Sequence, residues 1–138
     1  MSKYIHKVNY YETDKMGITH HSNSIRWMEE ARIDFLEKEG FGYAKLESEG
    51  IMSPVIGVEC EYKNSTTFYD DIEIEVSVKE FKGVKLVISY IMKNVKDDKV
   101  VLIGTSKHCF TDFNGRPIIL KKKNEKLDEK LKSLANEK

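Results

Sequence analysis

Residues 23–39 predict an amphipathic helix with an unusually wide apolar face. At about 100° per residue, its apolar side chains cover roughly half of the circumference. These side chains are Ile25, Trp27, Met28, Ala31, Phe35 and Leu36. Ser22 or Asn23 is the expected N-cap, and Gly40 follows the last helical residue. A flat sheet would cover only part of so wide an apolar face. We therefore expect this helix to pack against a surface that curves around it.

After Pro54 the apolar residues recur at every second position, which indicates strands. The strands are expected at 56–62, 72–78, 84–92 and 100–111, with an earlier one at 4–11. Short turns rich in Gly, Asp and Asn separate the later four, so neighbouring strands should be antiparallel. The predicted fold class is α+β, with one long central helix wrapped by a curved five-stranded antiparallel sheet. Its exposed edges favour dimerisation.

Two further helical features are expected. Residues 43–49 suggest a short helix. Arg32 falls inside the apolar arc, one turn from Glu29, which favours a structural ion pair between them over an acid–base role for Glu29.

The composition indicates one domain, residues 1–138, with no general affinity for polyanions. Lys plus Arg and Asp plus Glu number 23 each, so the formal net charge is zero. A chain of 138 residues has the size of one ordinary domain, and zero charge gives no field that would draw it to nucleic acid or to an anionic membrane.

Leucines at helical spacing in 121–138 predict a C-terminal helical tail, with a frayed tail as the alternative.

The protein is expected to be cytoplasmic. The N-terminus lacks the apolar region of a signal peptide, and no apolar run reaches the ~18 residues of a membrane span. Cys60 and Cys109 lie far apart, outside metal-binding or redox spacings, so we interpret them as small apolar side chains in a reducing compartment.

Candidate catalytic residues cluster between the first strand and the long helix. Asp14 lies three residues before Gly17, and His21 follows seven residues after Asp14, where the helix begins. A carboxylate beside the free N–H groups of a helix start can attack a carbonyl and hold the resulting oxyanion. Taken alone, Asp14 would more simply form an Asx turn. Metal binding by Asp14, His20 and His21 is disfavoured, because adjacent histidines rarely point at one ion.

The segment from Tyr10 to Arg32 resembles hotdog-fold acyl-CoA thioesterases of the 4-hydroxybenzoyl-CoA thioesterase type. Their pattern is Y-x-D-T-D-x-x-G-x-x-x-H-x-x-Y, followed by E-x-A-R on the helix. The matching residues are Tyr10, Thr13, Asp14, Gly17, His21, Glu29, Ala31 and Arg32. The chain departs from the pattern at Glu12, usually Asp, and at His20 and Ser24, where aromatic residues are common.

The resemblance implies a hydrolase that releases free CoA and a carboxylic acid. Asp14 is the expected base or nucleophile, Gly17 lets its loop approach the thioester, and backbone N–H groups near His21 form the oxyanion site. The His21 side chain would orient the carbonyl or Asp14, or serve only the helix start. Tyr10, His20 and Ser24 are expected to bind the substrate. Neither a metal nor a cofactor is expected, since coenzyme A is part of the substrate.

The resemblance also implies a homodimer, and beyond it a homotetramer, with the active site at the dimer interface and the nucleotide contacted by the second subunit. Basic residues that are candidates for the CoA phosphates, or are ordinary solvated side chains, are Lys63, Lys82, Lys85, Arg116 and Lys121 to Lys123. Two alternatives stay open: an acyl-ACP thioesterase, and a non-catalytic acyl-thioester-binding hotdog dimer. A hotdog hydratase would need a His-containing dyad that the sequence does not show.

Overall fold

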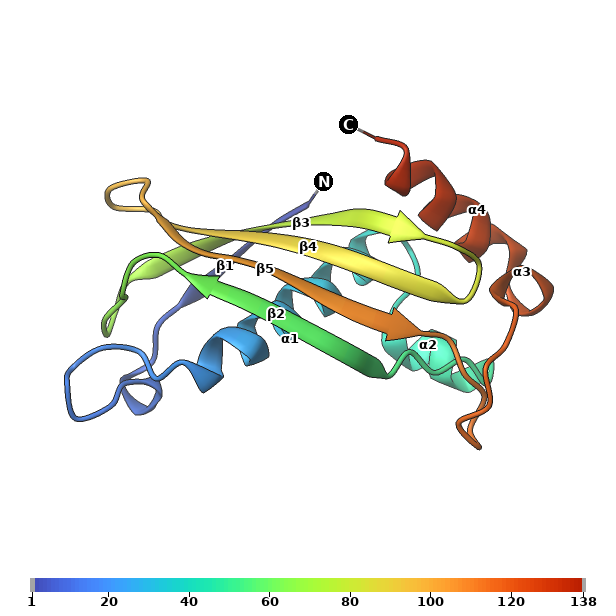
Figure 1. Ribbon diagram of the computed structural model, residues 1–138, viewed down its shortest axis with the longest axis horizontal. Helices are drawn as coiled ribbons and strands as arrows, with labels where there is room; N and C mark the ends of the chain where they lie inside the picture. Colours follow the sequence, from blue (N-terminus) through green and yellow to red (C-terminus); the bar gives the residue numbers. More distant parts are fainter. Residues whose placement is uncertain (1, 138) are drawn as a thin grey trace.

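The computed structural model describes residues 2–137. Five strands form one antiparallel sheet in the order β1-β3-β4-β5-β2 (Figure 1). The strands are β1 (Ser2–Lys7), β2 (Val55–Tyr62), β3 (Asp71–Phe81), β4 (Lys85–Asn94) and β5 (Val100–Cys109). The α-helices are α1 (Ser22–Lys38), α2 (Tyr43–Ser48), α3 (Leu120–Lys123) and α4 (Glu125–Ala135). The predicted five-stranded antiparallel sheet is confirmed, and α1 is accompanied by shorter helices in the two regions, 43–49 and 121–138, where further helices were expected.

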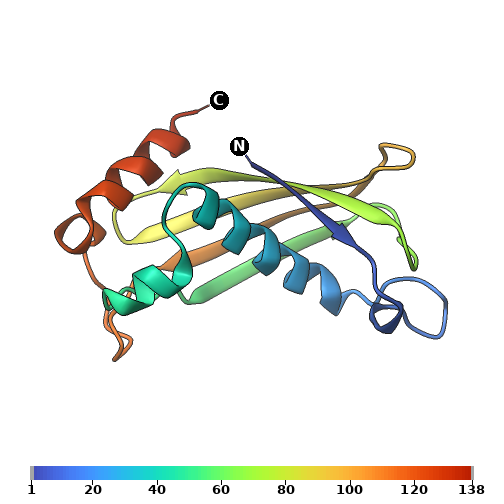
Figure 2. The same cartoon turned by 180° about the vertical axis from the view of Figure 1, so that it is seen from behind.

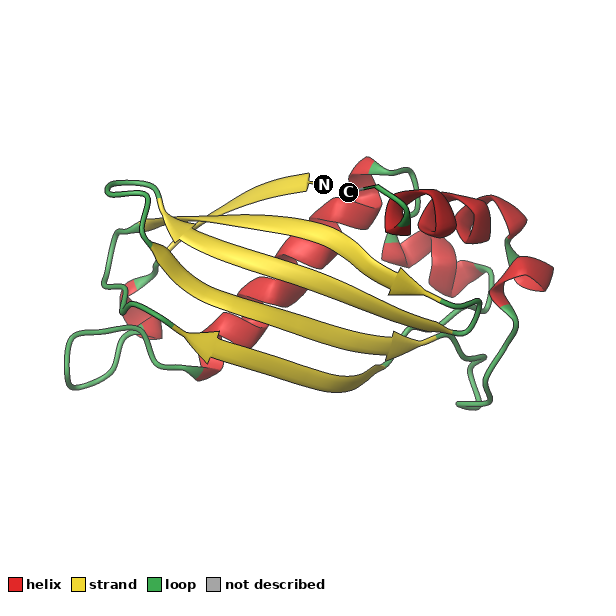
Figure 3. Cartoon of the chain, turned by 45° about the horizontal axis from the view of Figure 1, so that its top comes forward, coloured by secondary structure: helices red, strands yellow, loops and turns green. Residues whose placement is uncertain are grey.

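Helix α1 lies across one face of the sheet, as Figures 2 and 3 show. Its buried apolar side chains are Trp27, Met28, Ala31, Phe35 and Leu36. Alternate residues of β3 and β4 complete this core: Ile72, Ile74, Val76, Ile88, Tyr90 and Met92. The other residues of β3, such as Glu73 and Glu75, are only half-buried on the opposite face. Burial of the apolar faces therefore sets the position of α1 on the sheet.

The predicted boundaries fail near the candidate catalytic segment. Strand β1 ends at Lys7, and the chain then forms a 3₁₀ turn, η1 (Tyr10–Glu12). Helix α1 begins at Ser22 with His21 as N-cap residue, so neither Ser22 nor Asn23 is the cap. The ring Nδ1 of His20 accepts the Ser22 N–H at 3.2 Å, which satisfies one of the free donors at the helix start.

Two predictions about the faces of α1 are also wrong. Ile25, placed in the buried arc, is 47% exposed. Arg32 does not pair with Glu29, which is exposed. Instead its guanidinium donates to the Tyr43 hydroxyl at 2.8 Å and to the Tyr90 hydroxyl at 3.1 Å. Arg32 is therefore buried, and the two phenol oxygens accept hydrogen bonds from its guanidinium.

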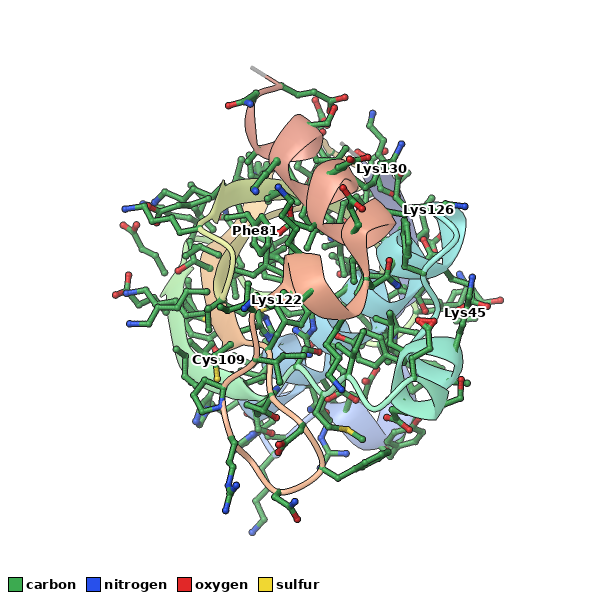
Figure 4. All side chains as sticks on the ribbon, turned by 90° about the vertical axis from the view of Figure 1, so that its right-hand side faces the viewer. Lys45, Phe81, Cys109, Lys122, Lys126 and Lys130 are labelled. Atoms are coloured by element: carbon green, nitrogen blue, oxygen red, sulfur yellow. The ribbon has the colours of Figure 1, made fainter. Side chains whose placement is uncertain are left out.

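The C-terminal tail is helical, as predicted, and packs on the body of the protein. Leu127, Leu131 and Leu134 of α4 are buried, and Asn124 caps the helix by accepting the Leu127 N–H at 3.0 Å. Figure 4 shows α3 and α4 at one end of the molecule, with Lys122 and the α4 lysines near the surface. Within residues 2–137, no helix combines the length and apolarity needed to cross a membrane.

Strand β2 is an exposed edge of the sheet. All eight of its residues are exposed or only half-buried, and among the described strands it pairs only with β5. Its exposed apolar residues are Val55, Ile56, Val58 and Tyr62. A long edge with apolar side chains favours pairing with another chain.

The buried His108 predicts a loss of stability in mild acid. His108 Nε2 lies 2.7 Å from the Ser106 hydroxyl, which contacts Tyr90. Burial, together with the nearby charge of Arg32, lowers the His108 pKa from 6.5 to about 4. The unfolded chain therefore binds the proton more strongly than the folded chain, and stability falls as the pH drops from 6.5 towards 4.

We expect this loss to approach about 1.4 kcal/mol per pH unit, the slope for one proton. Urea unfolding at pH 7, 6 and 5 measures it, and this window lies above the ordinary pKa of carboxyl groups. The His108→Gln variant is the control and should lack this part of the slope. Equal slopes in the two proteins would contradict the prediction.

Candidate functional site

Asp14 lies in a short closed loop between η1 and α1. One carboxylate oxygen, Oδ1, accepts the Met16 N–H at 2.8 Å, so the side chain does form the Asx turn considered above. The loop closes through the Asp14 N–H to the Ile18 carbonyl at 2.9 Å and through the Gly17 N–H to the Asp14 carbonyl at 3.0 Å. Among the described residues, the second oxygen of Asp14 has no hydrogen-bond partner. The turn thus fixes the carboxyl group while leaving one oxygen available.

Gly17 supplies a conformation that the loop requires. Its φ is +79°, a left-handed conformation that favours glycine. Its carbonyl accepts the Thr67 hydroxyl at 2.8 Å, which ties the loop to the segment before β3. A Cβ added at this position would meet nothing within 4 Å. The role of Gly17 is therefore conformational in this chain, since no close neighbour demands the missing side chain.

The start of α1 presents a free backbone donor. Within residues 2–137, the N–H of His21 donates to no acceptor, whereas the N–H groups of His20 and Asn23 are satisfied by Glu12 and His20. The Tyr62 hydroxyl donates to the His21 carbonyl at 2.9 Å, which fastens the helix start to β2. The imidazole rings of His20 and His21 lie 4.3 Å apart. The helix dipole makes the free donor a favourable site for negative charge.

The structure places four of the predicted site residues, Asp14, His20, His21 and Ser24, in two neighbouring depressions rather than one. His21 and Ser24 line a cavity of about 270 Å³, together with Ile18, Thr19, Trp27, Tyr62 and Val101. Asp14 and His20 line a larger, more polar depression of about 600 Å³, together with residues of α1 such as Arg26 and Glu29. The first turn of α1 contributes to both, so it forms the border between them.

The smaller cavity has apolar walls and a hydroxyl at its side. Ser24 is 5% exposed. Its hydroxyl contacts the Tyr62 phenol: burial raises the pKa of that phenol, and the contact with Ser24 partly offsets the rise. The small side chain at position 24 leaves open the space that an aromatic residue would fill.

Tyr10 is not part of either depression. It is 76% exposed and packs edge-on against Phe68, with ring centroids 5.6 Å apart. The other basic candidates lie near the end of the molecule opposite the start of α1 (Figure 1). Lys82 and Arg116 are in turns, Lys85 begins β4, and Lys121 to Lys123 belong to α3. Lys63 alone among the basic candidates lines the cavity beside His21. Among the described residues, no group of three metal-ligating side chains is positioned to hold an ion.

Glu12 is the residue that sequence reasoning underrated. Its carboxylate is almost fully buried and accepts hydrogen bonds from His6 Nε2 at 2.8 Å, the Asn9 N–H at 2.8 Å and Trp27 Nε1 at 2.7 Å. Burial raises the pKa of this carboxyl, but the three hydrogen bonds outweigh burial and leave the pKa below its ordinary value. A carboxylate two residues before Asp14 was visible in the sequence, but two of its three partners, His6 and Trp27, belong to β1 and α1, which only the fold brings to it.

Comparison with known proteins identifies the family. Residues 8–134 match the family described as the Thioesterase-like superfamily. The chain belongs to this superfamily. Its five-stranded sheet with helices is accordingly the hotdog-like thioesterase fold.

Several relatives in the thioesterase-like superfamily carry more specific names. A protein of Aquifex aeolicus (strain VF5), described provisionally as an esterase, is 38% identical over 120 residues, which cover 86% of this chain and 91% of the relative. The DHNA-CoA thioesterase of Staphylococcus aureus is 30% identical with a TM-score of 0.92, covering 98% of this chain and 93% of that one. The gentisyl-coenzyme A thioesterase BH1999 is 26% identical with a TM-score of 0.79, covering 85% and 94%. The family and these names agree on the reaction class, and the chain is a thioester hydrolase.

Proposed function

We propose that this thioesterase hydrolyses acyl-CoA, in the manner of the 4-hydroxybenzoyl-CoA type. The observation that carries the proposal is the presence of two reactive groups in the segment that leads into α1. One is the available oxygen of Asp14, and the other is the free N–H of His21. A carboxylate and an unsatisfied helix-start donor are the two parts that attack on a thioester carbonyl requires.

In this scheme the thioester lies over the border between the two depressions. Its carbonyl oxygen accepts the His21 N–H, and the negative charge that develops there is stabilised by the helix dipole. Asp14 approaches from the polar side. It either removes a proton from water as the water attacks, or attacks the carbonyl itself to give a mixed anhydride that water then cleaves. Both routes expel CoA thiolate, which takes up a proton, and neither needs a cofactor.

The acyl group would occupy the cavity beside Ser24. The cavity of about 270 Å³ is lined by Trp27 and Tyr62 and suits a compact acyl group, such as an aromatic one. The names of the gentisyl-coenzyme A and DHNA-CoA thioesterases support a CoA thioester as the substrate. His20, on the polar side, would contact the substrate nearer to Asp14. Tyr10 is exposed, so it would contact only the part of the substrate that lies outside the two depressions.

A second copy of the chain would complete the site. Two-fold pairing of β2 with the same strand of a partner is antiparallel, and it would cover the exposed edge. Such pairing would bring the far end of one subunit, which carries Arg116 and the lysines of α3, towards the start of α1 in the other. That arrangement would supply further basic residues for the CoA phosphates, since Lys63 is the one candidate among them that lines the cavity beside His21. A homotetramer of two such dimers and a cytoplasmic location both stay predictions.

Replacing Asp14 with Asn tests the catalytic role. Free-thiol release from short, medium, long and aromatic acyl-CoAs is measured for the wild type and for Asp14→Asn. We expect the variant to lose at least about 100-fold in kcat, because the amide can neither accept the proton nor attack. Turnover equal to that of the wild type would remove Asp14 from the mechanism.

Thiol release from acyl-ACP but from no acyl-CoA would favour the carrier-protein substrate, and release from neither would favour a binding protein.

Filling position 24 tests the acyl cavity. We expect Ser24→Tyr to reduce kcat/KM for aromatic acyl-CoA at least about tenfold while short acyl-CoA is less affected, because the larger ring takes up space in the cavity. Ser48→Ala, at the far end of the molecule, is the control and should leave the ratio unchanged. The same loss for every acyl group would show that Ser24 does not set acyl size.

A charge on the edge strand tests the interface. We expect the wild type to elute as a dimer or larger, and Val58→Lys to shift towards monomer and lose activity, because a lysine in the middle of β2 opposes edge pairing. Size-exclusion chromatography with light scattering measures the assembly. Ile91→Lys places the same charge on β4, away from the edge, and serves as the control. A fully active monomer would reject a site shared between subunits.

A further inference from the structure

Glu12 connects three segments that surround the candidate site. Its carboxylate accepts from β1 through His6, from the chain before η1 through Asn9, and from α1 through Trp27. Glu12 is only 5% exposed. A buried carboxylate is costly unless it is fully hydrogen-bonded, and here each contact is made by a well-placed donor. Such a group rigidly defines the relative positions of the elements that supply its donors.

The main chain of Glu12 adds two contacts to the start of α1. Its carbonyl accepts the His20 N–H at 2.8 Å and the Asn23 side-chain amide at 3.0 Å. Asp14 follows only two residues later, in the loop closed by its own hydrogen bonds. The same residue therefore anchors the chain that carries the Asp14 carboxylate and the helix start that carries the free N–H of His21.

Trp27 and Glu12 also form part of the wall between the two depressions. Trp27 lines the cavity that contains Ser24, and Glu12 lines the polar depression that contains Asp14. The hydrogen bond of 2.7 Å from the indole to the carboxylate joins the two sides. A substitution at Glu12 would therefore alter the walls of both depressions.

We propose that Glu12 is a positioning residue, which holds the Asp14 carboxylate and the His21 N–H at the separation that attack on the thioester requires. This inference rests on the proposed function. Glu12 itself touches no substrate and acts through Trp27, His20 and the loop of Asp14. Replacing one carboxylate oxygen with an amide nitrogen leaves the donor of His6 or that of Trp27 without its acceptor, so the helix start shifts relative to Asp14. A misplacement of about 1 Å can cost on the order of 100-fold in rate.

The test compares Glu12→Gln and Glu12→Asp with the wild type. Asp keeps the charge but shortens the side chain, whereas Gln keeps the length but replaces an acceptor with a donor. We expect kcat to decrease in the order wild type, Glu12→Asp, Glu12→Gln, with at least about a tenfold loss in the last. KM should change less than about threefold, because the walls of the acyl cavity remain. Trp27 is the only tryptophan of the chain, so its fluorescence reports directly on the contact with Glu12.

The matched control is Asp128→Asn on α4. Asp128 is as deeply buried as Glu12, at 1% exposed, and its carboxylate pairs with Lys132 at 2.8 Å at the other end of the molecule. This variant should change the unfolding midpoint while leaving kcat and the Trp27 emission at wild-type values. All assays are run well below the unfolding midpoint of each variant, so that loss of folded protein does not contribute.

Three outcomes would overturn the inference. The first is wild-type kcat in Glu12→Gln despite a shifted Trp27 emission, and the second is an equal kcat loss in Asp128→Asn. The third applies if Glu12→Gln does not fold. The inference is then tested with Glu12→Asp, and wild-type kcat in Glu12→Asp would overturn it. Failure of the proposed function looks different, because the wild type would then release no thiol or Asp14→Asn would keep full activity.

Discussion

The packing of α1 against the sheet is the contact on which the rest of the structure depends. Trp27, Met28 and Phe35 are buried in one core together with alternate residues of β3 and β4. Burying one large apolar side chain contributes about 1.5–3 kcal/mol, so this single interface supplies much of the hydrophobic stabilisation of a small fold. It also determines where α1 begins, and the start of α1 carries the groups to which we assign chemistry.

Two polar networks accompany this apolar interface, one near the start of α1 and one beyond its middle. Near its start, Glu12 accepts the Trp27 indole and the His6 ring. Farther along, Arg32 donates to Tyr43 and Tyr90. Each network links α1 to segments distant in the sequence, and each is buried, where unsatisfied donors or acceptors are costly. Apolar packing thus holds the helix against the sheet, whereas the polar contacts define its orientation there.

Helix α1, the antiparallel strands and the tail helix could be predicted because their signals are periodic and local. The spacing of Leu127, Leu131 and Leu134 is visible within one segment, and α4 forms there. The Asx turn of Asp14 was also foreseeable, since it involves a residue only two positions away. By contrast, the predicted pair of Glu29 with Arg32 was wrong. The guanidinium instead donates to two phenols, from α2 and β4, that the fold places beside it.

The sequence by itself determined the order of elements, the superfamily pattern from Tyr10 to Arg32, and the placing of a carboxylate just ahead of a helix start. Periodicity and short-range spacing carry that information because they act between near neighbours in the chain. Only the tertiary structure decided that Asp14 and His21 face different depressions, and that Glu12 and Trp27 form part of the wall between them. Those relations join residues from separate elements, and their geometry exists only once α1 is packed on the sheet.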